Sequence, residues 1–93
     1  MRLLFAEKVK NGKPVSDSHG HQVVCAAILD GNDLYVLLVD TLIGNYFIER
    51  VKDRFSLDVY RSSNFEKIES NEQWNTYHGF FVSMGIIPPT IGV

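Results

Sequence analysis

Two apolar runs separated by a short polar turn are the feature that most constrains how this chain folds. Residues Gln22–Leu29 and Leu34–Val39 are almost wholly apolar, and Asp30–Asp33 lies between them. Gly31 and Asn32 accept the positive φ angles of a tight turn, which favours a β-hairpin. Runs this continuous are typical of strands covered on both faces. The sequence therefore predicts a hairpin in the middle of a sheet.

A four-residue spacing of apolar side chains follows the hairpin. It joins Ile43, Phe47, Val51 and Phe55. A helix places residues at this spacing on one face, whereas a strand would also bring Glu49 and Asp53 onto that face. We therefore predict a helix over Leu42–Arg54.

A second helix is predicted near the carboxyl end of the chain. Ser70 and Gln73 have the spacing of a capping box, and helical periodicity follows them. Gly85 fits the position just past a helix end, so the helix is predicted over Asn71–Met84. Its apolar stripe, which should face the sheet, consists of Trp74, Tyr77, Phe81 and Met84.

The remaining elements complete an α+β prediction. Arg2–Val9 and Leu57–Tyr60 resemble strands, while Phe65–Ile68 fits either a short edge strand or a helical turn capped by Ser63. The 93 residues have room for a single domain, spanning 1–93. We expect a small antiparallel, meander-like sheet of four or five strands with two helices packed on it.

Charge gives little support to nucleic-acid binding. The formal net charge is −2, whereas nucleic-acid binders usually carry a basic excess. The amino-terminal arm is locally basic, with Arg2, Lys8, Lys10 and Lys13, but aromatic residues do not alternate with these cations. A regulator that binds nucleic acid through the amino-terminal lysines stays an alternative.

The stretch that most resembles a chemical site is Asp17–His21. In an extended segment Asp17, His19 and His21 would point to one side, where they could hold a zinc or iron ion. A solvated polar loop explains the same residues, so we expect no metal and no cofactor. A small metal-dependent enzyme using these residues stays a second alternative. The single cysteine, Cys25, has apolar neighbours and is expected to be a buried, unreactive core residue.

The carboxyl-terminal region carries no charge. No Lys, Arg, Asp or Glu follows Glu72, although a helix on the surface of a monomer normally has a charged outer face. Such a helix is either embedded in its own fold or covered by a partner. The residues predicted to form a protein interface are Asn75, Thr76, Gly79, Ser83, Ile87 and Ile91.

These observations favour binding over catalysis. We expect a non-enzymatic protein-binding module, acting as a stand-alone inhibitor, adaptor or accessory regulator of the kind found in phages and mobile elements. The expected partner is another protein of unknown identity or a second copy in a homodimer. A single cysteine fits the cytoplasm. The apolar start ends at Glu7, and no apolar run is long enough to span a membrane, so we expect no signal peptide and no membrane insertion.

Overall fold

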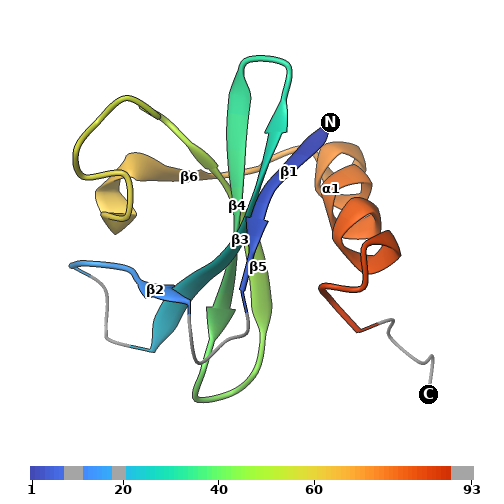
Figure 1. Cartoon of the computed structure of the whole chain (residues 1–93), viewed down its shortest axis with the longest axis horizontal. Helices are drawn as coiled ribbons and strands as arrows, with labels where there is room; N and C mark the ends of the chain where they lie inside the picture. The colour runs from blue at the N-terminus through green and yellow to red at the C-terminus, as the bar shows by residue number, and fades with distance from the viewer. Residues whose placement is uncertain (8–11, 18–20, 89–93) are drawn as a thin grey trace.

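A six-stranded antiparallel sheet with one helix on it forms the described part of the chain (Figure 1). The computed structural model describes residues 1–7, 12–17 and 21–88. Its main strand order is β1-β3-β4-β5-β6, and β2 pairs with β3 as well. The elements are β1 (Arg2–Ala6), β2 (Lys13–Pro14), β3 (Gln22–Asp30), β4 (Asp33–Asp40), β5 (Tyr46–Val51), the 3₁₀ turn η2 (Ser62–Asn64), β6 (Phe65–Lys67) and the helix α1 (Asn71–Ser83).

The predicted hairpin is confirmed as the central pair of the sheet, β3 and β4. Its turn lies at Gly31, which has φ +62°, and the pairing runs from Asp30 opposite Asp33 to Gln22 opposite Asp40. The register shifts between Val24 and Ala26, which leaves Cys25 as the extra residue of a β-bulge. The bulge changes which side chains of β3 face each side of the sheet.

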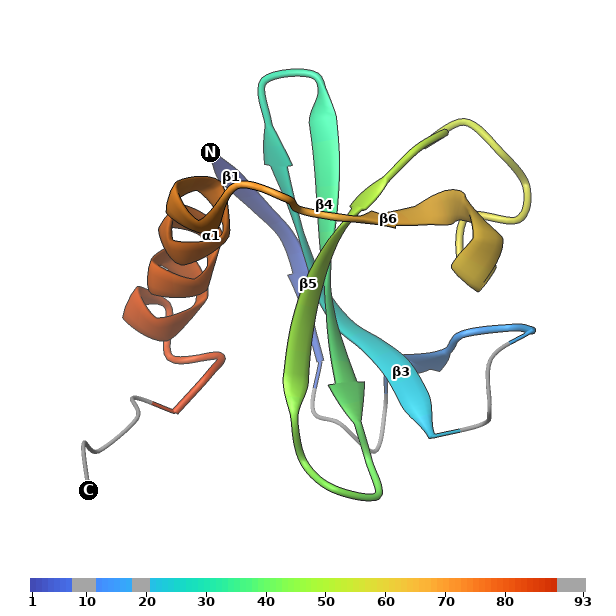
Figure 2. The same ribbon diagram turned by 180° about the vertical axis from the view of Figure 1, so that it is seen from behind.

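Both faces of the hairpin are covered, as the continuous apolar runs predict. One core lies between the sheet and α1 (Figures 1 and 2). It consists of Cys25, Ala26, Ile28, Tyr35, Leu37, Val39, Ile48, Tyr77, Phe81 and Ile87. The second core lies on the other face and consists of Val15, Val24, Ala27, Val36, Leu38, Val51 and Phe65.

The carboxyl-terminal helix is confirmed, with its predicted cap. The Ser70 side chain accepts a hydrogen bond from the Gln73 backbone N–H at 3.2 Å, and Gly85 ends the helix with φ +76°. Tyr77 and Phe81 are buried against the sheet, and Trp74 is partly buried there. Met84, predicted in the same stripe, is the C-cap residue and is 49% exposed.

A hydrogen-bonded chain ties α1 to the sheet. The Tyr77 hydroxyl donates to the Asp30 carboxylate at 2.9 Å, and the Gln73 amide donates to the hydroxyls of Tyr77 and Tyr35. The Tyr77 ring also packs on the Tyr35 ring, with 4.0 Å between centroids. At 13 residues α1 is too short to cross a bilayer, and no other helix in the described ranges is long and apolar enough to do so.

The prediction of a helix over Leu42–Arg54 is wrong, so α1 is the one α-helix of the described residues. The segment forms the strand β5, paired with β4 on one side and β6 on the other. A spacing of four is a multiple of the strand period as well, so Phe47 and Val51 share a face of β5. Glu49 does lie on that face, half-buried, where Lys67 pairs opposite it on β6.

The predicted strand over Leu57–Tyr60 is also wrong, because this segment forms turns. Local side-chain bonds satisfy its backbone: Asp53 accepts from the Phe55 N–H, and Ser56 accepts from the Asp58 N–H. Tyr60 packs against the second core, and its carbonyl accepts a hydrogen bond from the Ser16 N–H at 2.9 Å. The segment therefore covers the core without joining the sheet.

Two shorter predictions are resolved by the sheet. Of the two alternatives for Phe65–Ile68, the edge strand is correct, because β6 covers Phe65–Lys67. The first strand, predicted over Arg2–Val9, ends at Ala6, and Val9 lies outside the described residues.

We predict that Leu37→Asp abolishes folding. Leu37 is 0% exposed between the sheet and α1, so the carboxylate would be an unpaired charge in an apolar core. Near-ultraviolet circular dichroism should lose its tertiary signal. Leu42→Asp, at a side chain that is 72% exposed just after β4, is the matched control and should change the free energy of unfolding by no more than about 0.5 kcal/mol. A folded Leu37→Asp protein would contradict the central placement of β4.

Candidate functional site

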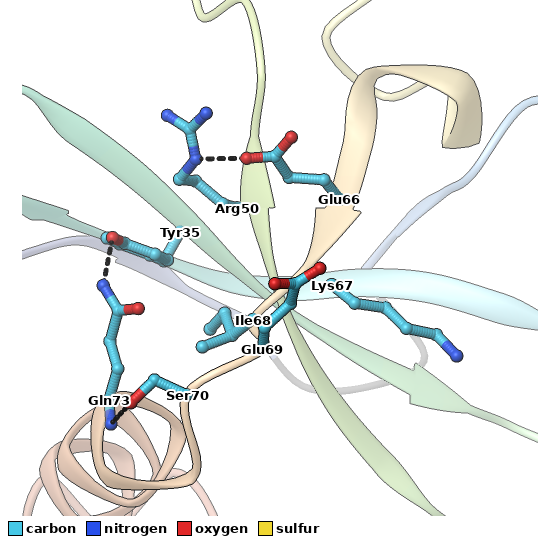
Figure 3. A pocket seen from close by; sticks show the side chains of 8 residues that line it. All are labelled: Tyr35, Arg50, Glu66, Lys67, Ile68, Glu69, Ser70 and Gln73. Atoms are coloured by element: carbon cyan, nitrogen blue, oxygen red, sulfur yellow. Dashed lines mark hydrogen bonds and ion pairs between the residues drawn. The ribbon is translucent and has the colours of Figure 1, made fainter.

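A polar pocket lies where β6 leads into α1 (Figure 3). Its volume is about 530 Å³. The lining residues are Tyr35, Arg50, Glu66, Lys67, Ile68, Glu69, Ser70 and Gln73. Charged groups of both signs face it, from Arg50, Glu66, Lys67 and Glu69.

Most polar groups of this pocket are already paired within the chain. The Arg50 guanidinium donates to Glu66 at 2.6 Å and to Asp33 at 3.4 Å, and the Glu66 carboxylate raises the pKa of Arg50. Ser70 caps α1, and Gln73 bonds both tyrosine hydroxyls. These interactions join β4, β5, β6 and α1. The paired groups therefore hold these four elements together.

A second depression runs between β5 and α1, and we call it the β5–α1 groove. It consists of two adjoining hollows of about 170 Å³ and 360 Å³ that share Tyr46 and Trp74. The first is also lined by Phe47, Ile48, Glu49, Lys67 and Ile68, and the second by Gly44, Asn45, His78, Ile87 and Pro88. No residue lining the second hollow carries a formal charge at neutral pH when histidine is neutral.

The turn between β4 and β5 forms one end of this groove. The Asp40 carboxylate accepts hydrogen bonds from the backbone N–H groups of Leu42 and Ile43, and Gly44 turns the chain with φ +76°. This arrangement leaves the Leu42 and Ile43 side chains 72% and 62% exposed. Two large apolar side chains are therefore exposed in the turn that leads into the larger hollow at Gly44.

Aromatic side chains of α1 form the wall of the groove. The Trp74 and His78 rings are stacked, with centroids 4.8 Å apart and 15° between their planes. The four-residue spacing places both on the same side of the helix. Ile87 was predicted at an interface, and its side chain is buried in the core between α1 and the sheet, where it lines the floor of the groove. Ile91 lies outside the described residues.

The predicted outward residues of α1 are exposed. Asn75, Thr76, Gly79 and Ser83 form a face that we call the α1 outer face. Gly79 has no internal packing reason to be glycine, because a Cβ placed there meets no atom within 4 Å. Its helical position costs about 1 kcal/mol relative to alanine. Packing within this fold therefore does not explain why residue 79 lacks a side chain.

The structure describes two of the three residues of the predicted metal site, Asp17 and His21. Asp17 accepts hydrogen bonds from the backbone N–H of Ser62, at 2.8 Å, and from its hydroxyl, and these bonds lower the pKa of the Asp17 carboxyl. His21 is exposed, and its carbonyl accepts from the Thr41 N–H. His19 lies outside the described residues, within which no group of three potential metal ligands occurs. Asp17 therefore anchors the loop after β2 to η2.

The other candidate residues have structural surroundings where they are described. Burial raises the pKa of the Cys25 thiol to about 11, and its sulfur lies 3.5 Å from the Leu37 carbonyl oxygen. Such a thiol is unreactive at neutral pH. The Lys13 ammonium lies 5.1 Å from the centre of the Tyr60 ring, a cation–π distance. Lys8 and Lys10 lie outside the described residues.

Sequence reasoning missed the β5 side of the groove. Tyr46 and the exposed pair Leu42 and Ile43 all lie within the helix predicted over Leu42–Arg54, which the structure does not contain. The turn could have been recognised from Asp40 and Gly44, which are typical of a capped turn after a strand. Trp74 was predicted only as a core residue, although it also lines the groove.

No protein-family model, curated protein or solved structure is significantly similar to this chain.

We predict that Glu49→Gln stabilises the protein at neutral pH. Burial raises the pKa of the Glu49 carboxyl, and Lys67 offsets this only in part. A raised pKa contributes stability that is full below the ordinary glutamate value of about 4.3 and is lost as the pH rises through the raised pKa. The thermal midpoint of Glu49→Gln should therefore exceed that of the wild type at about pH 7, and the gain should shrink toward about pH 3. Glu69→Gln, at an exposed carboxylate, controls for net charge. A lower midpoint at neutral pH would show that pairing with Lys67 outweighs burial.

We also predict that zinc leaves the thermal midpoint unchanged. Asp17 is engaged by Ser62, so it is not free to join an ion held by His21. The double variant His19→Ala/His21→Ala should unfold like the wild type, with or without zinc. A zinc-dependent rise in the wild type that is absent from the double variant would instead support the metal-dependent enzyme.

Proposed function

We propose that this protein is a binding module that acts by surface contact with another protein. The contact surface consists of the β5–α1 groove and the adjoining α1 outer face. The observation that carries the proposal is the combination of an uncharged hollow between Tyr46 and Trp74 with exposed apolar side chains at Leu42 and Ile43. A module of this size would act as an inhibitor, adaptor or accessory regulator by occupying a surface of its partner.

The chemistry of this surface favours contact with a protein. Charged residues are depleted from the centres of protein interfaces, where aromatic residues are enriched. The larger hollow has that composition, with Tyr46, Trp74 and His78 among its lining residues. Desolvating it requires no ion to lose its water shell, so association is less costly than at a charged surface. Two charged residues, Glu49 and Lys67, line the smaller, adjoining hollow. They lie opposite each other on β5 and β6.

Gly79 is a second, independent observation that favours the α1 outer face as a contact surface. A glycine in the middle of an exposed helix weakens that helix, and nothing inside this fold requires it. A missing side chain lets another backbone approach the helix closely. Such an approach would explain why the residue is glycine despite its cost.

We predict that Gly79→Ala has opposite effects on stability and binding. It should raise the free energy of unfolding by about 0.5–1 kcal/mol, because alanine favours the helix and the added methyl group meets open space. The same methyl group should weaken binding to a partner that packs against the helix. Chemical denaturation measures the first effect. Sedimentation, for self-association, and titration with a captured and purified partner measure the second.

Ser83→Lys tests the same face by charge. A cation at the last residue of α1 favours the helix dipole, so this variant should fold normally. It should lose self-association or partner binding, because it places an ion on the contact surface. Asn32→Lys adds the same charge at the exposed turn between β3 and β4 and should bind as the wild type does. If Ser83→Lys and Gly79→Ala both bind normally, the α1 outer face is plain solvent surface.

A further inference from the structure

The part of β5 next to the groove is an open edge of the sheet. β6 pairs only with Glu49, Arg50 and Val51, and then the chain leaves toward α1. Within the part of the chain that the structure describes, the first half of β5, Tyr46–Ile48, therefore has β4 on one side and no strand on the other. Figure 2 shows this half of β5 below the segment that crosses from β6 to α1.

Hydrogen bonds at the two ends of β5 define which backbone groups point outward. The Asp40 N–H donates to the Asn45 carbonyl, so odd-numbered residues from Asn45 onward direct their backbone groups toward β4. The Lys52 N–H donates to the Asn64 carbonyl, which agrees that even-numbered residues face the β6 side. Tyr46 thus presents an N–H donor and a carbonyl acceptor to the open edge, and Ile48 presents an N–H donor there, while its carbonyl faces Ile68 next to β6.

The other sheet edges carry features that discourage pairing, and this half of β5 does not. β1 has a register shift between Leu3 and Phe5, which marks a β-bulge, and β6 is a three-residue strand that includes Glu66 and Lys67. Bulges, short length and charges all protect exposed edges. Tyr46–Ile48 has no charged residue, and its pairing with β4 is regular. It is the edge best suited to accept another strand.

Open space lies directly beside this edge. The smaller hollow of the groove is lined by Tyr46, Phe47, Ile48 and Trp74, and the larger hollow continues it along α1. Tyr46 and Ile48 face α1, whereas Phe47 faces the opposite side and is 39% exposed. A strand laid on this edge would have apolar surface against both of its faces.

We propose that Tyr46–Ile48 binds an extended, uncharged segment of the partner protein by β-strand addition, an inference that rests on the proposed function. The outward backbone groups of Tyr46 and Ile48 match those of an extended main chain. The larger hollow, which no Lys, Arg, Asp or Glu lines, suits small apolar or aromatic side chains at alternate positions. In the larger hollow a charged side chain would lose its hydration without an opposite charge to replace it.

A second copy of this chain fits the edge less well. Two β5 strands paired about a two-fold axis at Phe47 would set Tyr46 against Ile48 of the second copy. The next pair would place Asn45 of the second copy opposite Glu49, where Lys67 already pairs. A free extended segment avoids this conflict because it can end or turn away after Ile48.

A random heptapeptide library displayed on phage provides the probe, followed by a synthetic copy of the strongest binder. We expect selected peptides to lack charges at their central positions. Amide hydrogen exchange should show the Tyr46 and Ile48 N–H groups exchanging fast in the free protein and slowly in the complex. The N–H groups of Phe47 and Glu49, which face β4, should be protected in both states. Failure to select a peptide, or protection gained elsewhere on the surface, would overturn the proposal.

Replacing single backbone amides by esters tests the hydrogen bonds without changing any side chain. The single Cys25 provides a ligation point for assembling the chain from synthetic segments. An ester at Ile48 removes an outward N–H, so it should leave the thermal midpoint unchanged and weaken peptide binding by about two- to twelve-fold. An ester at Phe47 is the matched control and should lower the thermal midpoint, because that N–H bonds to β4.

Trp74→Ala separates this inference from the proposed function. If Trp74→Ala weakens binding of the selected peptide and the Ile48 ester does not, the groove is a contact surface but strand addition is wrong. If neither change weakens binding, the peptide binds elsewhere and both proposals fail. If both weaken binding, strand addition in the groove is supported.

Discussion

Burial of the β3–β4 hairpin on both faces is the constraint on which the rest of the structure depends. Its apolar runs need cover on each side, and 93 residues provide few elements to give it. α1 covers one face with Tyr77 and Phe81, while Val15, Tyr60 and Phe65 help to cover the other. Most of the chain outside the hairpin is therefore used to exclude water from these two strands.

The parts of the fold that could be predicted are those whose signals are local. The turn at Gly31, the cap at Ser70 and the end of α1 at Gly85 each depend on a few neighbouring residues. β5 could not be identified this way, because a spacing of four residues suits a strand and a helix equally. The deciding facts are distant in sequence: β6 pairs beside Glu49 and β4 provides the buried neighbour Val36. A half-buried carboxylate with a raised pKa is the cost of that arrangement.

The candidate site was predictable to the same extent. The α1 outer face follows from helical periodicity and an absence of charge, both of which are read from the chain directly. The groove requires β5 to lie beside α1, so Tyr46 and Trp74 meet only after the strand is placed correctly. The segment Leu57–Tyr60 shows that local signals can also predict a strand that does not form. Its composition suits a strand, yet Asp53 and Ser56 satisfy the backbone of this region by local hydrogen bonds.

The open edge of β5 follows from the way α1 is attached. Ser70 must reach the first turn of the helix to accept the Gln73 N–H, so the chain has to leave the sheet after Lys67. If β6 continued along β5, it would pair with Ile48 and Tyr46, and α1 would start too late to set Tyr77 against Tyr35 and Asp30. Covering one face of the hairpin therefore leaves half of β5 without a neighbour. The outward backbone groups of Tyr46 and Ile48 and the hollows beside them arise from the same turn of the chain, so the proposed binding edge requires no change in the core.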